Sequence, residues 1–233
     1  MFPLIAENMV ITHKEYTILG PINLTIKEGG INVVLGPNGS GKTTLLKGLH
    51  GIVRLHNGCV KWSISKKDSM QKQMFVFQSP IMLRRTVLEN LAYPLTLRKV
   101  PKAQALCKAE EWAQKISMSN FIHQKATRLS QGEKQKLALA RALITRPAML
   151  FLDEPSASLD GQTTLEIERL LKASLKLGTT IMMSTHDIGQ AKRLANTILF
   201  LKAGKLESIQ SADQFFKKPK ATSARKFIAG DIV

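Results

Sequence analysis

The sequence predicts an α/β fold, in which two separated parts of the chain build a parallel sheet and a mainly helical segment lies between them. The first observation is a set of short apolar runs at residues 31–35, 149–152 and 179–184, typical of strands buried on both faces. The second is the alternation of strand and helix patterns around these runs. We expect one domain, with an α/β core of residues 1–79 and 147–233 and a helical subdomain of residues 80–146.

The N-terminal part is expected to hold strands, turns and one helix. Apolar and polar residues alternate over 22–26, which indicates a half-buried strand. No breaker interrupts residues 43–49, so a helix is expected there. The pair Asn57-Gly58 is a turn signal and predicts a following strand over 59–64.

The middle and C-terminal parts contain the clearest helix patterns. Residues 103–116 are rich in Ala, Leu, Glu and Lys, which are strong helix formers. Pro94 and Pro101 are expected to break the helices around them. Ser130 is placed to open a helix that runs toward residue 144, and residues 165–177 form an amphipathic pattern that ends at a glycine.

Composition indicates an ordinary globular chain. The 233 residues are 44% hydrophobic and 22% charged, which argues against disordered and fibrous classes. No apolar run reaches the roughly 18 residues of a membrane-spanning helix, and the N-terminus does not read as a secretion signal. Cys59 and Cys107 show no disulfide or metal spacing, so we expect two packing residues in a reducing compartment.

The net charge is the unusual number. Lys and Arg total 34 against 17 Asp and Glu, a net charge of +17, so a polyanionic partner is expected: nucleic acid, nucleotide or an acidic membrane surface. The basic residues are spread along the chain, which most often describes a solvated face. The sequence shows no zinc spacing, RNA-binding signature or zipper, so no nucleic-acid partner is expected.

A phosphate-binding loop follows the first buried strand. Its residues match the pattern G-x-x-x-x-G-K-[ST] and run in order as Gly36, Pro37, Asn38, Gly39, Ser40, Gly41, Lys42 and Thr43, followed by Thr44. Glycines let successive N–H groups turn inward, and the helix N-terminus adds partial positive charge. Lys42 is expected to reach the β- and γ-phosphates, and the Thr43 hydroxyl to bind Mg²⁺.

Two carboxylates follow the apolar run at 149–152. Ligands of parallel α/β sheets bind beyond the carboxyl ends of the strands. Asp153 is therefore placed to hold Mg²⁺, and Glu154 to polarise a water beside the γ-phosphate. Isolated acidic pairs are usually only solvated, but this pair follows a buried strand in a chain with a phosphate loop.

A capping box opens the helix that starts near residue 130. Its residues are Ser130, Gln131, Gly132 and Glu133. On its own this pattern indicates a well-capped helix. Its spacing from the carboxylates is a further observation, because Ser130 lies 23 residues before Asp153.

Together these motifs resemble the nucleotide-binding subunit of ABC transporters, over nearly the whole chain. Residues 36–43 resemble its Walker A loop, 129–133 its signature motif and 148–154 its Walker B strand. Gln78 resembles the Q-loop glutamine. Residues 158–160 resemble the D-loop and His186 the switch histidine.

The resemblance implies a P-loop NTPase core with a parallel sheet, an N-terminal antiparallel β subdomain and an inserted helical subdomain. It also implies ATP and Mg²⁺ as cofactors and two copies facing head to tail, each offering Ser130 and Gly132 to the other's ATP. Glu154 would be the general base and His186 would contact the γ-phosphate. Gln78 would sense Mg²⁺ and link the site to the membrane partner.

Two positions depart from the family pattern. The signature usually reads LSGGQ or LSGGE, whereas Gln131 stands here at the third position and could crowd the γ-phosphate. The family also stacks an aromatic residue on adenine. Tyr16 is the candidate, although it lies slightly beyond the usual position near His13.

The implied partners are a transmembrane permease and, through it, a periplasmic substrate-binding protein. The chain would then be a peripheral protein on the cytoplasmic face of the inner membrane. Residues 86–91 and 93–95, and the tail segments 215–219 and 227–233, resemble those of short-tailed subunits of tungstate or phosphate importers. We expect residues 78–97 to form the groove for a permease helix, and the basic excess over 202–233 to favour an anionic lipid surface.

Two other functions stay open from the sequence. One is a stand-alone ABC-type ATPase acting on nucleic acid or ribosomes, which the charge favours and the single cassette opposes. The other is an exporter subunit. Neighbouring genes that encode a permease and a binding protein would favour import over both.

Overall fold

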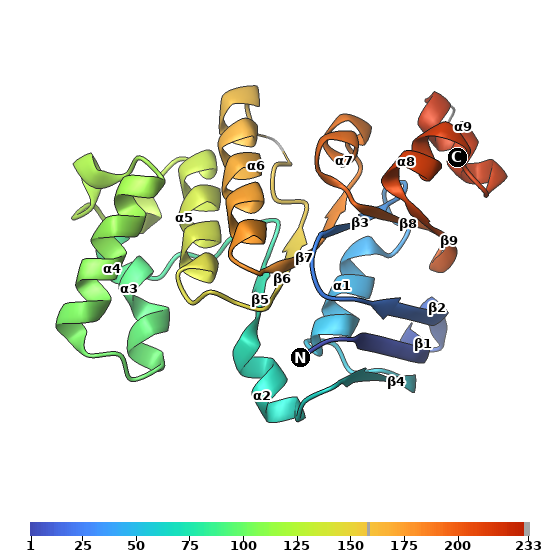
Figure 1. The fold of residues 1–233 in the computed structure, drawn as a ribbon, viewed down its shortest axis with the longest axis horizontal. Helices are drawn as coiled ribbons and strands as arrows, with labels where there is room; N and C mark the ends of the chain where they lie inside the picture. Colours follow the sequence, from blue (N-terminus) through green and yellow to red (C-terminus); the bar gives the residue numbers. More distant parts are fainter. Residues whose placement is uncertain (158, 231–233) are drawn as a thin grey trace.

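Two β-sheets, with one helix between them, form the core of this computed structural model, which describes residues 1–157 and 159–230 (Figure 1). The antiparallel three-stranded sheet has the order β2-β1-β4, with β1 (Leu4–His13), β2 (Tyr16–Ile26) and β4 (Asn57–Trp62). The six-stranded sheet has the order β5-β6-β7-β3-β8-β9, with β3 (Ile31–Leu35), β5 (Gln73–Val76), β6 (Met149–Asp153), β7 (Thr180–Thr185), β8 (Thr197–Lys202) and β9 (Lys205–Ser211).

The apolar runs form the centre of the larger sheet, as predicted. Strands β3, β6 and β7 are buried along their whole length and pair in parallel. Only the edge strand β9 runs antiparallel, against β8. In the register, Leu35 lies opposite Thr185, and Asp153 lies opposite Ser184. The residues that follow these three strands therefore meet at one edge of the sheet.

Helix α1 (Lys42–His50) is packed between the two sheets (Figure 1). Its buried face is formed by Leu45, Leu46 and Leu49. These leucines share one apolar cluster with strands β1 and β2 and with one face of the larger sheet. Because the phosphate loop joins β3 to α1, this packing fixes the loop at both ends.

The opposite face of the larger sheet is covered by helices from the second half of the chain. They are α5 (Gln131–Leu143), α6 (Gly161–Lys176), α7 (Ile188–Leu194), α8 (Ala212–Lys217) and α9 (Thr222–Ala229). The amphipathic pattern over 165–177 is confirmed, but the helix begins earlier, because Asp160 caps it by accepting the Thr163 N–H at 2.8 Å.

A third apolar cluster holds the helical segment together. It joins α3 (Val87–Leu97), α4 (Lys102–Lys115) and α5 with two short 3₁₀ turns, η1 (Ser119–Phe121) and η2 (Ala126–Arg128). In Figure 1 these helices lie at one end of the molecule, and α5 links them to the sheet. Capping boxes open α3 at Thr86 and α5 at Ser130.

Two local predictions were wrong, and one helix was missed. Asn57 and Gly58 belong to strand β4 and do not form the predicted turn. The glycine is needed there for another reason: Gly58 lies at a bulge, where a side chain would collide with the Asn8 carbonyl. Pro94 lies inside α3, where apolar packing of the neighbouring turns maintains the helix despite the lost hydrogen bond. Helix α2 (Lys66–Lys72) was not predicted.

The cysteines also differ from the expectation of two packing residues. Cys107 is exposed on α4, and Cys59 is half-buried with its thiol 3.5 Å from a Glu7 carboxylate oxygen. Both are free thiols. Among the described residues, no helix combines the length and the apolar character that crossing a bilayer requires.

Candidate nucleotide-binding site

The phosphate loop is folded so tightly that the structure requires glycine at two of its positions. A Cβ on Gly36 would lie 2.0 Å from the Leu201 carbonyl oxygen, so only glycine fits there. Gly41, with φ of +98°, turns the chain into α1 through a left-handed conformation. The Gly204 N–H donates to the Ser40 carbonyl at 2.9 Å. The turn after β8 therefore holds the loop in place.

Lys42 lies inside this loop and is only 6% exposed. Its ammonium donates to the carbonyls of Gly36 at 3.0 Å and Pro37 at 3.1 Å, and lies 3.6 Å from a Glu154 carboxylate oxygen. Burial lowers the pKa of Lys42, while Glu154 and Asp153 partly oppose that shift. A buried cation of this kind gains from an anionic ligand.

A second polar atom of the loop lacks a partner. The Ser40 hydroxyl is buried and makes no hydrogen bond to any described residue. Buried hydroxyls are normally paired, so an unpaired one beside a buried ammonium fits a loop built to receive phosphate oxygens.

Thr43, Asp153 and Ser184 form a small oxygen cluster beside the loop. The hydroxyls of Thr43 and Ser184 donate to the same Asp153 oxygen, at 2.7 and 2.8 Å. Asp153 is 4% exposed. Oxygen ligands of this type suit Mg²⁺, so Thr43 and Asp153 fit the predicted metal ligands. Ser184 was missed by sequence reasoning, although a polar residue within an apolar strand was a usable signal.

Glu154 points into the space between Lys42 and His186. Its backbone has φ of +44°, and its N–H donates to the Ser184 hydroxyl at 3.0 Å. One carboxylate oxygen lies 3.1 Å from His186 Nδ1. The His186 side chain is 51% exposed, whereas that of Glu154 is 13% exposed. The structure thus brings Lys42, Glu154 and His186 together at the sheet edge.

Two predicted residues, Gln78 and Tyr16, make no hydrogen bond or ion pair with this cluster in the described part of the chain. Gln78 follows β5, which neighbours β6, and its exposed side chain makes no hydrogen bond to another described residue. Tyr16 begins β2 and is 78% exposed. Strand β2 approaches the loop at Leu19, whose Cδ1 would lie 3.3 Å from a Cβ on Gly41.

No hydrogen bond or ion pair among the described residues joins the signature residues to the phosphate loop of the same chain. Ser130 and Gln131 are exposed, and Gly132 and Glu133 are half-buried at the start of α5. The Ser130 hydroxyl and N–H both donate to one Glu133 carboxylate oxygen at 2.8 Å. In the D-loop, Ser158 lies outside the described residues. Asp160 caps α6, and hydrogen bonds from Thr163 lower the pKa of that carboxyl.

A buried asparagine organises the chain just after Gln78. Asn90 is 0% exposed, and its amide nitrogen donates to three carbonyls of the preceding segment, those of Leu83, Arg85 and Thr86. Its amide oxygen accepts from Arg141 at 3.1 Å, and Arg141 also donates to the Ile81 carbonyl at 2.8 Å. The segment 81–86 is therefore bound to α5, the helix that the signature opens.

Comparison with known families identifies this arrangement. A family model described as ABC transporter matches residues 19–157, more than half of the chain. The chain belongs to the ABC transporter family. The matched region includes the phosphate loop, Gln78, the signature and both carboxylates. The chain is therefore an ATP-binding protein and an ABC-type ATPase.

Several curated relatives match this ABC ATPase over most of its length. The tungstate uptake system ATP-binding protein TupC of Peptoclostridium acidaminophilum is 38% identical, covering 90% of this chain and 98% of the relative. The arginine transport ATP-binding protein ArtM of Bacillus subtilis is 32% identical, covering 95% and 97%. The molybdate/tungstate import ATP-binding protein WtpC of Pyrococcus horikoshii is 31% identical, covering 95% of this chain and 66% of the longer relative.

Solved structures confirm the predicted fold class. A dimeric structure of the ATP-binding cassette MJ0796, in a post-hydrolysis state with ADP and Pi, has a TM-score of 0.80 at 28% identity and covers 90% of this chain and 98% of that one. CbiO1 of Clostridium perfringens, part of the transporter complex cbiONQ, has a TM-score of 0.80 at 26% identity, covering 92% and 90%.

Proposed function

We propose that two copies of this ABC ATPase bind magnesium-ATP at their shared interface and hydrolyse it, and that hydrolysis drives import of an oxyanion such as tungstate through a separate permease. The observation that carries the catalytic part is the buried Lys42, with Thr43, Asp153 and Glu154 gathered around its loop. The oxyanion part is supported by the 38% identical tungstate uptake relative.

Lys42 and the loop would hold the phosphates. On binding, the ammonium exchanges the Gly36 and Pro37 carbonyls and the Glu154 carboxylate for β- and γ-phosphate oxygens. The loop N–H groups and the N-terminus of α1 add donors and partial positive charge. The remaining loop residues, with Thr44 and the adenine-stacking Tyr16, would complete the nucleotide site.

Thr43 and Asp153 would hold Mg²⁺, with Gln78 joining from the end of the neighbouring strand. When bound, the ion supplies positive charge that neutralises the phosphate oxygens. Ser184 has a positioning role, because its hydroxyl donates to Asp153 and accepts from the Glu154 N–H in the turn that follows. The hydroxyl therefore fixes the metal ligand relative to the general base.

Glu154 would act as the general base. The water oxygen attacks the γ-phosphorus, the bond from that phosphorus to the β,γ-bridging oxygen breaks, and ADP leaves. The water proton passes to the Glu154 carboxylate, which is freed from Lys42 when phosphate enters. His186, now 3.1 Å from Glu154, would contact the γ-phosphate from the solvent side.

The signature of one copy would complete the site of the other. Ser130 and the Gly132 N–H lie at an exposed helix N-terminus, which suits an anion, yet they make no contact with their own phosphate loop in the described chain. The MJ0796 cassette, a similar protein, is dimeric with ADP and Pi. We infer the same head-to-tail pairing here.

The first experiment is ATP binding and hydrolysis by the purified chain beside Lys42→Ala. The native chain should bind ATP and release phosphate, and Lys42→Ala should lose binding. A chain that binds no ATP, or a variant that binds as the native chain does, would overturn the proposed roles. Circular dichroism of both proteins checks folding.

The permease would dock beside the Asn90-bound segment. A hollow of about 300 Å³ there is lined by the end of β5 and by parts of α3 and α5. Its rim exposes three large apolar side chains, those of Phe77, Ile81 and Leu97. An apolar permease helix would cover them, and Asn90 would carry its displacement to α5.

Crosslinking tests this docking. Ile81 is 76% exposed, so Ile81→Cys gives a better probe than Leu83, which is half-buried. Cys59 and Cys107 are replaced by serine beforehand, because both are free thiols. Ile81→Cys should crosslink to a cysteine on the permease in the assembled complex, whereas a cysteine at exposed Lys14 should not. Absence of any crosslink from position 81 would contradict the docking surface.

The cargo is tested in membranes. The chain, its permease and its binding protein are reconstituted in vesicles, and ATP hydrolysis is measured with tungstate, molybdate, phosphate and arginine. Tungstate should stimulate most strongly. Stimulation by arginine alone would refute the oxyanion, and salt-sensitive stimulation by RNA or DNA without the permease would favour the nucleic-acid function.

Attachment to the cytoplasmic face of the membrane would be strengthened by charge. Residues 202–233 contain seven Lys and Arg and three Asp and Glu. The excess should attract anionic lipid within about 10 Å at moderate salt. Sedimentation with vesicles checks this: binding should need anionic lipid and fall with salt, and binding that ignores both would exclude it.

A further inference from the structure

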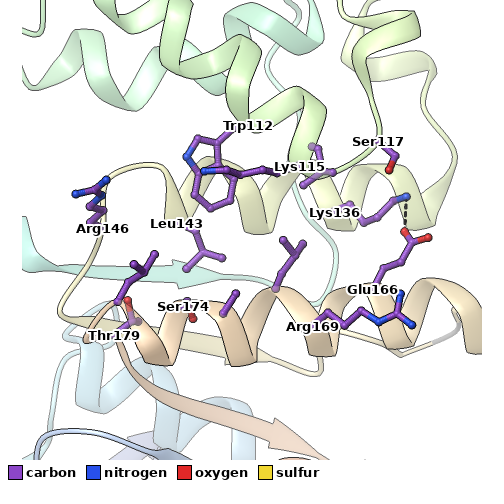
Figure 2. Close-up of a pocket in the computed structure, with 14 residues that line it drawn as sticks. Trp112, Lys115, Ser117, Lys136, Leu143, Arg146, Glu166, Arg169, Ser174 and Thr179 are labelled. Atoms are coloured by element: carbon purple, nitrogen blue, oxygen red, sulfur yellow. Dashed lines mark hydrogen bonds and ion pairs between the residues drawn. The ribbon is translucent and has the colours of Figure 1, made fainter.

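A hollow of about 460 Å³ lies between the helical segment and the core, at a place that the nucleotide site does not use (Figure 2). The end of α4 forms one wall, and α5 and α6 form the others. None of its lining residues belongs to the phosphate loop, the signature or the carboxylate pair. Its volume is within the usual range of small-molecule pockets.

The interior of this pocket is suited to hydrocarbon. Its apolar lining comes from Trp112, Ile116, Leu143, Leu170, Ala173 and Leu177. Three hydroxyl side chains also line it, those of Ser117, Ser174 and Thr179. The two beside the apolar residues of α6 and the turn after it already have partners: Ser174 donates to the Leu171 carbonyl at 2.8 Å, and Thr179 to the Pro147 carbonyl at 2.9 Å. A ligand body therefore finds apolar surface and no unsatisfied hydrogen-bonding group of these two side chains.

The rim of the pocket is strongly basic. Four cations line it, Lys115, Lys136, Arg146 and Arg169, against a single carboxylate, Glu166. Glu166 pairs with Lys136 at 2.8 Å. Within residues 1–157 and 159–230, the other three cations have no carboxylate at ion-pair distance. The rim therefore carries uncompensated positive charge beside an apolar interior.

The pocket has two different ends. Lys115 and Arg146 also line an adjoining hollow of about 320 Å³, together with Trp112, so these two cations stand at the same end. The Lys115 ammonium lies 5.0 Å from the centre of the Trp112 ring. Figure 2 shows Arg146 at one end and the Lys136–Glu166 pair at the other. Glu111 also lines that adjoining hollow, but among the described residues it forms no ion pair with either cation. An anionic head group therefore fits the first end, since at the second end Lys136 is already paired with Glu166.

We propose that this pocket binds an amphipathic carboxylate of the fatty-acid class. The carboxylate is held by Arg146 and Lys115, and the hydrocarbon chain lies along Trp112, Leu143 and Leu170. The bound molecule touches the helical segment through α4 and α5 and the core through α6. The proposal concerns a site separate from the nucleotide site and stands independently of the cargo.

Tryptophan fluorescence gives a direct test, because the chain has only two tryptophans. Trp62 packs on Phe2 in the small sheet, so Trp62→Phe leaves Trp112 as the only reporter. Titration with sodium decanoate should change Trp112 emission and saturate. Decanol and decyltrimethylammonium should bind at least about tenfold more weakly, since they lack the carboxylate.

Matched variants locate the head group. In the Trp62→Phe protein, Arg146→Gln should weaken decanoate binding about tenfold, and Arg146→Lys should restore most of it. Arg169→Gln, which removes a cation at the opposite end, should leave the affinity within about twofold. Unchanged ATP hydrolysis shows that these variants are folded.

Three results would overturn the proposal. The first is a Trp112 signal that does not saturate with decanoate. The second is decanol binding as tightly as decanoate, which would make the pocket merely apolar. The third is an equal loss of affinity in Arg146→Gln and Arg169→Gln, which would make the basic rim a diffuse attraction without a head-group site.

Discussion

The phosphate loop and the signature segment are both helix N-termini, yet they differ in what surrounds them. At the loop, Lys42 is 6% exposed and lies among two carbonyls and the Glu154 carboxylate. At the signature, Ser130 is exposed, and among the described residues its N–H and hydroxyl donate only to Glu133 of the same helix. The loop is therefore a preformed site whose buried cation is paired, and the signature is a capped helix end that faces solvent.

This difference shows how one chain can hold two halves of a site. A buried cation needs an anion, so the loop is ready to bind phosphate without help. An exposed, self-capped helix end has no such need, because its donors are satisfied by Glu133 and water. In the proposed pair, it acts only when a second copy brings phosphate to it. The loop should therefore govern binding, and the signature should govern turnover.

The largest effect is expected from Glu154→Gln. The amide cannot take the water proton, so hydrolysis should fall by about 10² to 10⁴-fold, whereas ATP binding is retained. Phosphate release and nucleotide binding measure the two separately, and size-exclusion chromatography with ATP should show a dimer. Glu166→Gln, a lysine-paired carboxylate away from the loop, is the control. Undiminished hydrolysis in Glu154→Gln would place the base elsewhere.

Acid should lower the stability of the fold around the phosphate loop through His50. This residue ends α1, the helix that Lys42 begins. Burial between Phe75 and Phe151 lowers the pKa of His50 to about 4 from the ordinary 6.5. The folded pKa is the lower one, so the unfolded chain binds the proton more tightly. Stability is therefore full above pH 6.5 and falls by about 3 kcal/mol as the pH drops to 4.

Urea unfolding at pH 7 and pH 4.5 checks this expectation. His50→Phe should flatten the pH dependence, because the buried Nδ1 has no hydrogen-bond partner among the described residues and a phenyl ring cannot take up a proton. The exposed His56→Gln should keep the native slope. An unchanged slope in His50→Phe would show that another group carries the acid sensitivity.

The two capping boxes separate structure from function at the signature. Thr86 and Ser130 make the same cap, with Glu89 and Glu133 as reciprocal acceptors. Alanine at either position should cost about 1 kcal/mol of stability. Only Ser130→Ala should also lower hydrolysis, by about tenfold or more, because in the proposed pair only Ser130 donates to the partner's γ-phosphate. Equal losses of hydrolysis in both variants would reduce the signature serine to a cap.

The smallest effect is expected at the departure from the family signature. Gln131 is the first residue of α5 and is exposed, so Gln131→Gly costs the helix little. Removing the side chain should raise the hydrolysis rate by no more than about threefold, a change under 1 kcal/mol in the barrier. Steady-state hydrolysis checks this, and a fall in rate would mean that Gln131 assists the approach of phosphate.

The parts of the fold that were predicted from sequence are those with strong local signals. The strands around β3 and β6 are continuous apolar runs, and the phosphate loop and the Ser130 capping box are short patterns with fixed spacing. Helix α2 was missed because its sequence is polar and it is fixed by a Ser65 cap and a single buried serine. Gly58 was misplaced because its bulge is set by the opposing strand.

The candidate site shows the same difference between local patterns and contacts that depend on the rest of the fold. Lys42, Thr43, Asp153, Glu154 and His186 were found from motifs, and the sheet register brings them together. Ser184 was missed, because its bond to Asp153 depends on the pairing of β6 with β7. The closure of the loop by Gly204 and Leu201 depends on a turn more than 150 residues away in the chain, which no local pattern encodes.

The most direct test of the central claim mixes two inactive proteins. Lys42→Ala lacks a working phosphate loop but keeps its signature. Ser130→Asp keeps its loop and its helix cap, but places a carboxylate against the partner's γ-phosphate. In a head-to-tail pair, a mixed dimer has one site with an intact loop and an intact signature. ATP hydrolysis should therefore appear in the mixture and be absent from each protein alone. A mixture that remains as inactive as its components, beside an active native protein, would contradict the shared site.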